Sequence, residues 1–552
     1  MGHLKLNNYI NIINLIFIIF LTYIFFITSI FTDNLIFFNL IERIEYKDTN
    51  FKDYLCYLNE FSIYPLYLLQ KIFGFKFSYL FLTISIGILF SYFTVKIYSH
   101  IFQKIASINI YFIIFFFYMP FGIGGYYVDN VIYLLSIISL YFFLKNIKYN
   151  YIFSAFFLST IIMVKSFHVA PFLISISVIF LYKLLFENKK YEVIKDAVIF
   201  YFSILIMVII FSSLYLYYNK ISFNLFYEYQ FKQSLFLSTS RFDEFIYKFF
   251  FLDFNLFNAI LNKNFGVILF YPFIIIFYIS LFFLVKNIKK KSHLNKNIFL
   301  IFMVFSTSIN FMMAGRDLNH KILFLPILFF AIISLLNFKF SNKFSKFFPL
   351  LTTIVLLLYS LFPINERVNI KDFLSNKINF KNTLLKLEDG RYKDFYYSHR
   401  SRFFAQQNIY NILEQINLIN NFFNNEFNKK NDDYKFIFFD DESLTISSTL
   451  NKKNCSPVCA NLYRNNPPEY TLSRSLYINN FKKFYELENA VLIVCYINRN
   501  KNQLCLKKPS LIADGKGSVP ADFNRFPQLR ESINSSIEIF TTKNFSIYKY
   551  NK

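Results

Sequence analysis

Residues 169–218 read VAPFLISISVIFLYKLLFENKKYEVIKDAVIFYFSILIMVIIFSSLYLYY. This stretch contains two apolar runs, 169–186 and 197–218. Four lysines lie at or between their facing ends: Lys183, Lys189, Lys190 and Lys195. Runs of about 20 apolar residues are long enough to span a bilayer. Because positive charge is retained in the cytoplasm during insertion, the stretch predicts two spans joined on that side.

The same alternation extends along the first 363 residues. Eleven apolar runs lie near 9–31, 77–98, 107–121, 130–145, 151–164, 169–186, 197–218, 266–285, 297–314, 322–338 and 348–363. With a cytoplasmic N-terminus, the cytoplasmic connections carry seventeen lysines: Lys5, Lys96, Lys104, Lys145, Lys148, Lys183, Lys189, Lys190, Lys195, Lys286, Lys289, Lys290, Lys291, Lys296, Lys339, Lys343 and Lys346. The short connections on the other face hold three basic residues: Lys165, Arg316 and Lys321. The asymmetry predicts that loops 32–76 and 219–265 and everything after residue 363 lie outside the cytoplasm.

Composition agrees with a membrane protein. The chain has 552 residues, of which 55% are hydrophobic, and a formal net charge of +24. Its length accommodates a membrane domain and one soluble domain. Much of the positive charge consists of the cytoplasmic lysines, which meet anionic lipid. We therefore expect membrane lipids, and no nucleic acid, as partners.

After Phe362-Pro363 the apolar runs stop and the composition turns rich in Asn, Lys and Asp. Apolar residues spaced three and four apart predict a helix at 402–427. Short β-like runs follow at 434–439, 490–496, 537–541 and 545–550, with a turn at 542–544. The expected fold is mainly α. It comprises a polytopic helix bundle of about eleven spans at 1–363 and a smaller extracytoplasmic α/β domain at 364–552.

All five cysteines fall in segments expected outside the cytoplasm, which fits an oxidising compartment. Cys495 and Cys505 flank a polar turn and are placed to pair across a hairpin. Cys455 and Cys459 bound a short loop that could also close. A zinc site is the alternative interpretation, but no His lies nearby.

The first external loop carries six acids: Asp33, Glu42, Glu45, Asp48, Asp53 and Glu60. Asp33 directly follows the first span, where a carboxylate near the membrane surface can act as a general base on a hydroxyl. A solvated loop whose acids only keep it outside is the alternative. The loop continues into Tyr64–Lys71, an amphipathic stretch that could lie along the membrane interface.

Ionisable residues also lie at the ends of two other expected spans. Asp129 begins the fourth span, either as a helix cap or as a second site carboxylate. Lys165 and His168 lie between two apolar runs, where an ionisable pair is costly unless it faces a polar cavity or an anion. A phosphate-facing role for the pair is weighed against snorkelling to the interface.

A cation cluster stands at the external end of the run near 297–314. Arg316, His320 and Lys321 lie within a few residues of each other on a face otherwise poor in cations. The planar fork of Arg suits a phosphate, and Lys or His adds point charge. The alternative is a structural Arg316–Asp317 arrangement.

This ordered set resembles the polytopic C-type glycosyltransferases that use polyprenyl-phosphate sugars, such as protein O-mannosyltransferases and the aminoarabinose transferase of lipid A. The resemblance covers roughly residues 9–363 by layout. It rests on Asp33 after span one, Tyr64-Pro65-Leu-Tyr67 before span two, Asp129, Lys165, and the region from Arg316 onward. The chain differs in having Asn34 after Asp33, where the family often has paired acids. It also lacks Trp, and with it the Trp-Trp-Asp motif of oligosaccharyltransferases.

The resemblance implies a mechanism that needs no metal or cofactor. A lipid-linked sugar would bind with its phosphate against Lys165, His168, Arg316, His320 and Lys321. Asp33, aided by Asp129, would deprotonate an acceptor hydroxyl, which attacks the anomeric carbon with inversion. The acceptor is a glycan, a lipid or a protein. The codon-like composition bias and the absence of an obvious eukaryotic accessory domain favour a bacterial inner (plasma) membrane with the C-terminal domain in the periplasm. An endoplasmic reticulum membrane with this domain in the lumen is the alternative.

Three other functions remain open from the sequence. A polysaccharide polymerase or ligase would use the same lipid-linked substrates, with 219–265 as its external loop. A transporter or flippase would be expected to carry internal repeats, and none of fixed period is seen. An adhesion or assembly component would act through its C-terminal domain.

Overall fold

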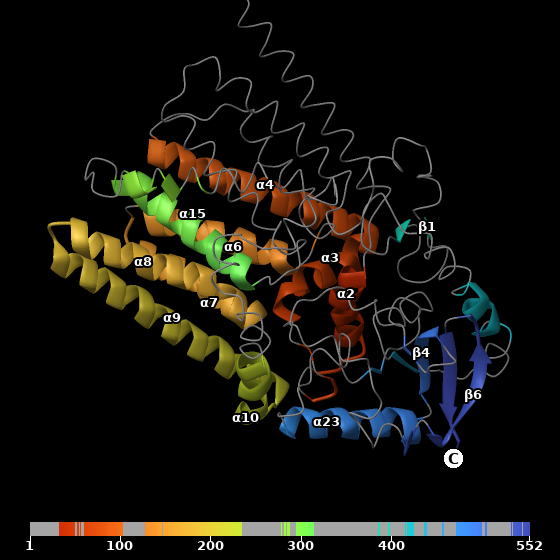
Figure 1. The fold of residues 1–552 in the computed structure, drawn as a ribbon. Coiled ribbons are helices and arrows are strands. Elements are labelled where there is room, and N and C mark those ends of the chain that lie inside the picture. The colour runs from red at the N-terminus through yellow and green to blue at the C-terminus, as the bar shows by residue number, and fades with distance from the viewer. Residues whose placement is uncertain are drawn as a thin grey trace, which may run out of the picture. The chain divides into compact units, whose positions relative to one another are not determined.

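The computed structural model describes part of the chain, and most of that part is helical, with a five-stranded sheet near the C-terminus (Figure 1) and a separate pair of short strands. A mainly α fold with a small sheet is therefore confirmed. The described residues are 32–49, 52–54, 56, 60–102, 126, 128–145, 147–233, 278, 281–282, 284–286, 294–313, 385–386, 396–397, 415, 417–423, 425, 435–438, 455–456, 471–488, 490–498, 503–504, 531–532, 534–543 and 545–551.

Six described helices coincide with expected apolar runs: α4 (Phe75–Phe102), α6 (Val128–Leu144), α7 (Asn150–Lys165), α8 (Ala170–Phe186), α9 (Lys190–Asn219) and α15 (Leu294–Met313). Within the described residues, α4 and α9 are long and apolar enough to cross a membrane. The other four are shorter apolar helices. The runs at 9–31, 107–121, 322–338 and 348–363, and most of 266–285, lie outside the described residues.

Short turns join successive helices. The 3₁₀ turn η2 (Ser166–Val169) connects α7 to α8. Pro171 lies in the first turn of α8, where its missing N–H removes no intrahelical hydrogen bond. Tyr149 precedes α7 with a left-handed backbone (φ 65°), which turns the chain back after α6.

Aromatic rings gather where four of these helices meet. The ring of Phe143, in the last turn of α6, lies 5.4 Å from the ring of Tyr151 at the start of α7. It also lies 5.4 Å from Phe180 near the end of α8 and 6.0 Å from Phe200 in the first half of α9. Successive helices α6 to α9 therefore run antiparallel, side by side (Figure 1).

Two polar contacts bring further helix ends to the same place. At the end of α4, a ring nitrogen of His100 lies 3.0 Å from the carbonyl oxygen of Leu144, the last residue of α6. The amide of Asn297, near the start of α15, donates to the hydroxyl of Tyr182 near the end of α8 at 2.8 Å. All six helices thus have an end in this region.

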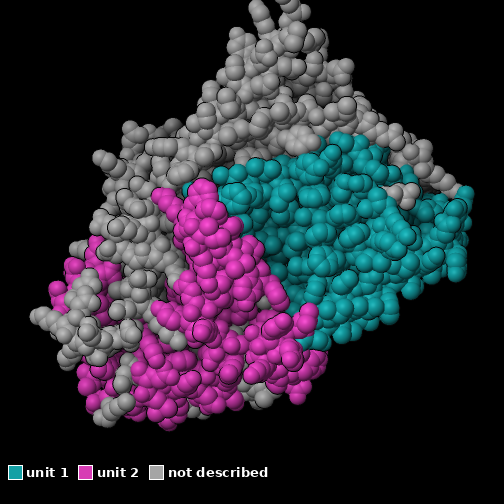
Figure 2. All heavy atoms as spheres, turned by 180° about the vertical axis from the view of Figure 1, so that it is seen from behind, with its two compact units in different colours: residues 1–27, 79–213, 241–378 teal, residues 28–78, 214–240, 379–552 magenta. Residues whose placement is uncertain are grey.

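The chain divides into two compact units (Figure 2). Unit 1 comprises residues 1–27, 79–213 and 241–378, and unit 2 comprises 28–78, 214–240 and 379–552. The division falls inside α4 and α9. Unit 2 is therefore assembled from three segments that are far apart in the sequence.

Unit 2 contains short helices and two small sheets. Its helical elements are α2 (Thr32–Glu45), η1 (Glu60–Ser62), α3 (Tyr64–Phe73), α10 (Phe223–Phe226), η3 (Tyr227–Gln233), α23 (Thr471–Lys482) and η7 (Lys483–Leu487). Its strands are β1 (Leu385–Lys386), β2 (Tyr396–Tyr397), β3 (Phe436–Phe438), β4 (Val491–Asn498), β5 (Gln503–Leu504), β6 (Ser536–Thr541) and β7 (Phe545–Tyr550). The larger sheet has the order β3-β4-β7-β6, with β5 also paired to β4. β3 and β4 are parallel, and the other pairs are antiparallel.

Four strands confirm the expected β-like runs at 434–439, 490–496, 537–541 and 545–550. The expected turn at 542–544 joins β6 to β7, where the amide of Thr542 donates to the carbonyl of Phe545 at 2.8 Å. The helix expected at 402–427 is observed over 417–423 within the described residues. These elements are set by local apolar pattern and turn residues, which explains why the sequence reveals them.

The cysteines agree with the sequence in part. β4 and β5 form the expected hairpin, with Tyr496 opposite Leu504, while Cys505 lies outside the described residues, so its pairing with Cys495 stays a prediction. Cys459 lies outside the described residues, so closure of the Cys455–Cys459 loop also stays a prediction. Cys455 itself is buried, and its amide donates to the carbonyl of Phe436 on β3 at 2.7 Å.

Candidate functional site

Five of the seven expected site residues have side chains outside the described part of the structure. Asp33 is the second residue of α2, and Asp129 is the second residue of α6, as its predicted place at the start of a span requires. Only their backbones are described. Arg316, His320 and Lys321 lie wholly outside the described residues. The roles of these residues therefore stay predictions.

Lys165 and His168 lie together at one end of unit 1. Lys165 is the last residue of α7, and His168 is in the 3₁₀ turn η2 that follows. Both are half-buried. This turn is at the end of α7 opposite Tyr151, and hence opposite the aromatic cluster of Phe143. Lys165 and His168 are thus separated by the length of a helix from the ends that carry most of the lysines.

The antiparallel alignment of α6 and α7 places Asp129 relative to Lys165. The hydroxyl of Ser139 on α6 donates to the carbonyl of Ser154 on α7 at 2.9 Å. Counting outward from this pair along two antiparallel helices brings position 129 level with position 165. The structure therefore brings the backbone of one expected carboxylate to the same end of a helix pair as the expected phosphate-binding lysine.

Among the acids of the first external loop, Glu60 has the most distinctive surroundings. The residue is 7% exposed, and each of its carboxylate oxygens accepts a phenol O–H at 2.9 Å. The donors are Tyr54, six residues earlier, and Tyr215, near the end of α9. Burial, followed by the neighbouring charge of Glu60, holds the pKa of the Tyr54 hydroxyl well above its usual range. Tyr54 therefore remains protonated and able to donate.

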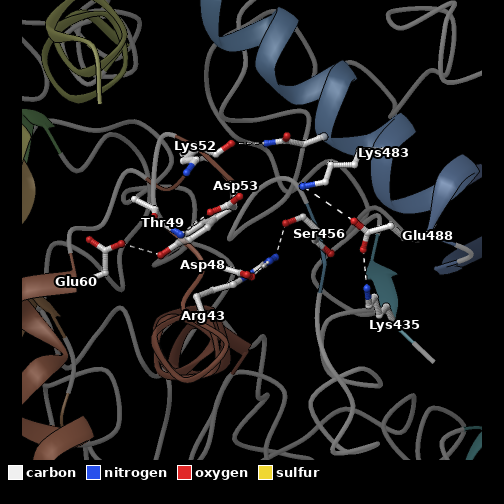
Figure 3. A network of polar contacts seen from close by, with 12 residues as sticks. Arg43, Asp48, Thr49, Lys52, Asp53, Glu60, Lys435, Ser456, Lys483 and Glu488 are labelled. Atoms are coloured by element: carbon white, nitrogen blue, oxygen red, sulfur yellow. Dashed lines mark hydrogen bonds and ion pairs between the residues drawn. The ribbon is translucent and has the colours of Figure 1, made fainter. Parts of the chain in front are cut away.

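The ring of Tyr54 is also in contact with a buried cation. The guanidinium carbon of Arg43, on α2, lies 4.9 Å from the ring centroid. Arg43 is completely buried and donates to the carboxylate of Asp48 at 2.9 Å. It also donates to the backbone carbonyl of Ser456 (Figure 3). One side chain of the first loop thus combines an ion pair, a cation–π contact and a hydrogen bond to the C-terminal segment.

A further hydrogen bond joins the first loop to the C-terminal segment: the amide of Asn480 on α23 donates to the carbonyl of Lys52 at 2.9 Å. In the first loop, Cys56 is buried and takes part in a disulfide. Within the C-terminal segment, Lys435 and Glu488 form an ion pair at 2.6 Å (Figure 3), and this hydrogen bond raises the pKa of the Lys435 ammonium. The first loop is therefore an integral part of a folded body with the C-terminal segment.

The remaining loop acids with described contacts have simpler roles. Asp53 accepts the backbone N–H of Thr49 at 2.8 Å, closing a local turn. Glu45 is exposed and accepts a hydrogen bond from the side-chain amide of Gln70 at 2.9 Å.

Within the described residues, no group of three or more His, Cys, Asp or Glu side chains is placed to hold a metal ion.

Sequence reasoning missed Arg43, Tyr54 and Tyr215. A signal for one of them is present, because Arg43 is the only arginine in the first 240 residues of a lysine-rich chain. Arg is favoured over Lys where a cation must make several directed contacts in a buried place. The tyrosines give no comparable signal among 42 in the chain.

Comparison with known proteins gives no match, either to a protein-family model or to a curated protein sequence.

Proposed function

We propose that the protein is a multi-pass membrane glycosyltransferase that moves a sugar from a polyprenyl-phosphate donor to an acceptor hydroxyl on the extracytoplasmic face. The observation that carries this proposal is which segments of the chain make up unit 2. Lysine asymmetry in the sequence assigns three segments to the outside, namely 32–76, 219–265 and everything after 363. Unit 2 consists of 28–78, 214–240 and 379–552. Segments that pack into one body must share a compartment, so unit 2 supports the external assignment of 32–76, 219–240 and 379–552, whereas 241–265 and 364–378 belong to unit 1.

The surface of α9 supports a lipid environment. Its side chains Val198, Phe202, Leu205 and Ile209 are 54–60% exposed. A soluble protein rarely leaves a contiguous apolar face of this length in water. A helix in the core of a soluble protein would instead bury these residues. Lipid chains are therefore the fitting neighbours for this face of α9.

The helix ends support the same topology. The aromatic cluster brings together the end of α6, the start of α7, the end of α8 and the beginning of α9, near Lys145, Lys148, Lys183 and Lys190 in the sequence. These are the ends that the positive-inside rule assigns to the cytoplasm. Lys165 and His168 lie at the opposite end of α7. By the same rule they would lie at the extracytoplasmic ends of the helices, as a donor phosphate requires.

The proposed chemistry follows the roles that the sequence suggests. Asp33, at the start of α2, takes the proton of the acceptor hydroxyl as general base, with Asp129 as a second carboxylate. The acceptor oxygen attacks the anomeric carbon as the bond to the donor phosphate breaks. Lys165, with the cluster around Arg316, stabilises the charge that develops on the departing polyprenyl phosphate. Stabilisation of developing charge is usually the largest contribution to such a reaction.

The test uses purified protein in lipid nanodiscs and a panel of radiolabelled polyprenyl-phosphate sugars. Release of sugar from lipid is followed for the wild type and for Asp33→Asn. We expect release by the wild type and a loss of about 10²–10⁴-fold in the variant, the usual contribution of a general base. Glu45→Gln is the matched control, because it neutralises an exposed acid on the same helix. Release that is equal in wild type and Asp33→Asn would remove Asp33 as the base. Absence of release with every donor would favour a polymerase or a transporter.

A further inference from the structure

A continuous series of polar contacts reaches all three segments of unit 2. It starts at Ser456 in the C-terminal segment, whose carbonyl accepts from Arg43 on α2. The guanidinium of Arg43 lies against the ring of Tyr54, and Tyr54 donates to Glu60. Glu60 in turn accepts from Tyr215, in the segment that begins within α9. Glu60 is thus the contact between the first and second segments of this series.

Stability alone does not explain a carboxylate at this position. A buried charge is costly even when it is paired, and apolar side chains of similar volume often give equal or better stability. A carboxylate, however, fixes position, because two directed hydrogen bonds must be satisfied at once. Here the two donors come from residues 155 and 6 positions away from Glu60 in the sequence.

The rings around Tyr215 reinforce this attachment. Phe61 lies next to Glu60, and its ring centroid is 5.7 Å from that of Tyr215. The ring centroid of Phe226, on α10, also lies 5.7 Å from that of Tyr215. The hydroxyl of Tyr215 is therefore held by Glu60, and its ring is held by two aromatic neighbours.

We propose that Glu60 is a positioning residue that locks the C-terminal end of α9 to the loop following α2. Through Tyr54 and Arg43 it fixes the orientation of α2, the helix whose second residue is Asp33. The link to catalysis rests on the proposed function, whereas the lock itself is a property of the fold. Breaking it would leave Asp33 chemically intact but poorly placed.

The lock can be tested without any enzymatic activity. The chain has no Trp, so Phe61→Trp introduces a single fluorescent reporter beside Tyr215. Phe61 is 43% exposed, which leaves room for the larger indole. In the nanodisc-embedded protein we expect Glu60→Gln to lower the fluorescence anisotropy of this Trp and to increase its quenching by acrylamide. Glu45→Gln, in the same reporter background, should change neither.

Two milder variants keep the test decisive if Glu60→Gln folds poorly. Tyr54→Phe and Tyr215→Phe each remove one hydrogen bond and keep the ring. Each should give a partial change of the same sign. An unchanged reporter in Glu60→Gln, or in both tyrosine variants, would overturn the lock.

Transfer assays separate the two proposals. If the wild type transfers sugar, Tyr215→Phe and Glu60→Gln should lower kcat by up to about 100-fold, the penalty for a small misplacement of reacting groups, at unchanged donor KM. Unchanged kcat alongside a changed reporter would overturn the catalytic link and leave the lock standing. If the wild type transfers nothing while the variants change the reporter, the result would count against the proposed function and leave the lock standing. An active wild type with an unchanged reporter in these variants would count against the lock.

Discussion

Helix α9 exposes its apolar side chains, whereas the sheet of unit 2 buries them. Val198 and Phe202 on α9 are more than half exposed, while Val491 and Ile493 on β4 and Ile547 on β7 are fully buried. The sheet follows the rule for a protein in water. Helix α9 does not follow this rule, because exposed apolar side chains occur along its whole length. This difference is the one expected if α9 faces lipid, as proposed, and unit 2 faces water.

Polar groups differ between the regions in the same way. The buried polar atoms of the helix bundle are mostly hydroxyls that bond to a carbonyl one turn back, as Ser159 does to Ala155 at 2.8 Å. Such groups are satisfied within one helix and need no water. Unit 2 instead buries the charged residues Arg43 and Glu60 and satisfies them across distant segments. The polar groups thus differ in the way that the proposed lipid-facing bundle and water-facing unit 2 would require.

The largest expected effect comes from removing the buried cation of unit 2. Arg43→Met leaves the nearly buried carboxylate of Asp48 without its guanidinium, which should lower the free energy of unfolding by about 3–5 kcal/mol. Thermal unfolding followed by circular dichroism measures the change. Lys189→Met is the control, because its pair with Glu192 is exposed and its loss should leave the unfolding temperature unchanged.

A second variant sharpens this result. Adding Asp48→Leu to Arg43→Met removes both charges and should recover most of the lost stability. Equal unfolding temperatures for wild type and Arg43→Met would show that the pair contributes nothing to the fold of unit 2.

An intermediate effect is expected on the exposed face of α9. Leu205→Arg places a charge near the middle of the helix, and in a bilayer this costs about 2.5–3.5 kcal/mol. The fraction of protein that resists extraction from membranes by alkaline carbonate should fall. Ile537→Arg on β6 is the control, because Ile537 is similarly exposed but belongs to unit 2. Equal insertion of both variants would contradict a lipid-facing α9.

The smallest perturbation tests α3, the amphipathic stretch expected at the membrane interface. Leu68 and Ile72 on α3 are exposed, and α4 begins two residues after α3 ends. Leu68→Trp should change stability by no more than about 0.5 kcal/mol. Its fluorescence should be quenched by lipids brominated on their acyl chains, and that of Ile537→Trp should not. If the brominated lipids quench neither the Leu68→Trp nor the Ile537→Trp fluorescence, α3 does not lie against the lipid.

Sequence reasoning predicted the parts of this fold that are encoded locally. The helices from α6 to α9 follow from apolar runs bounded by charged turns, and the strands β6 and β7 follow from two short runs around a polar turn. The site was predicted less well, because its contacts join residues far apart. Glu60 and Tyr215 are separated by 155 positions, and Arg43 and Ser456 by 413. No periodicity within either segment records such a pairing.

The separation of Arg43 from Ser456 has a consequence for biosynthesis. A ribosome adds roughly 5–20 residues per second. The α2 segment is therefore made roughly 20–80 seconds before the carbonyl that its arginine binds, since 413 residues separate them. During that interval Arg43 can pair with Asp48 but lacks its contact with Ser456, and Cys56 is still a thiol. We expect the nascent loop to depend on chaperones and on controlled thiol oxidation until the last segment of the chain arrives.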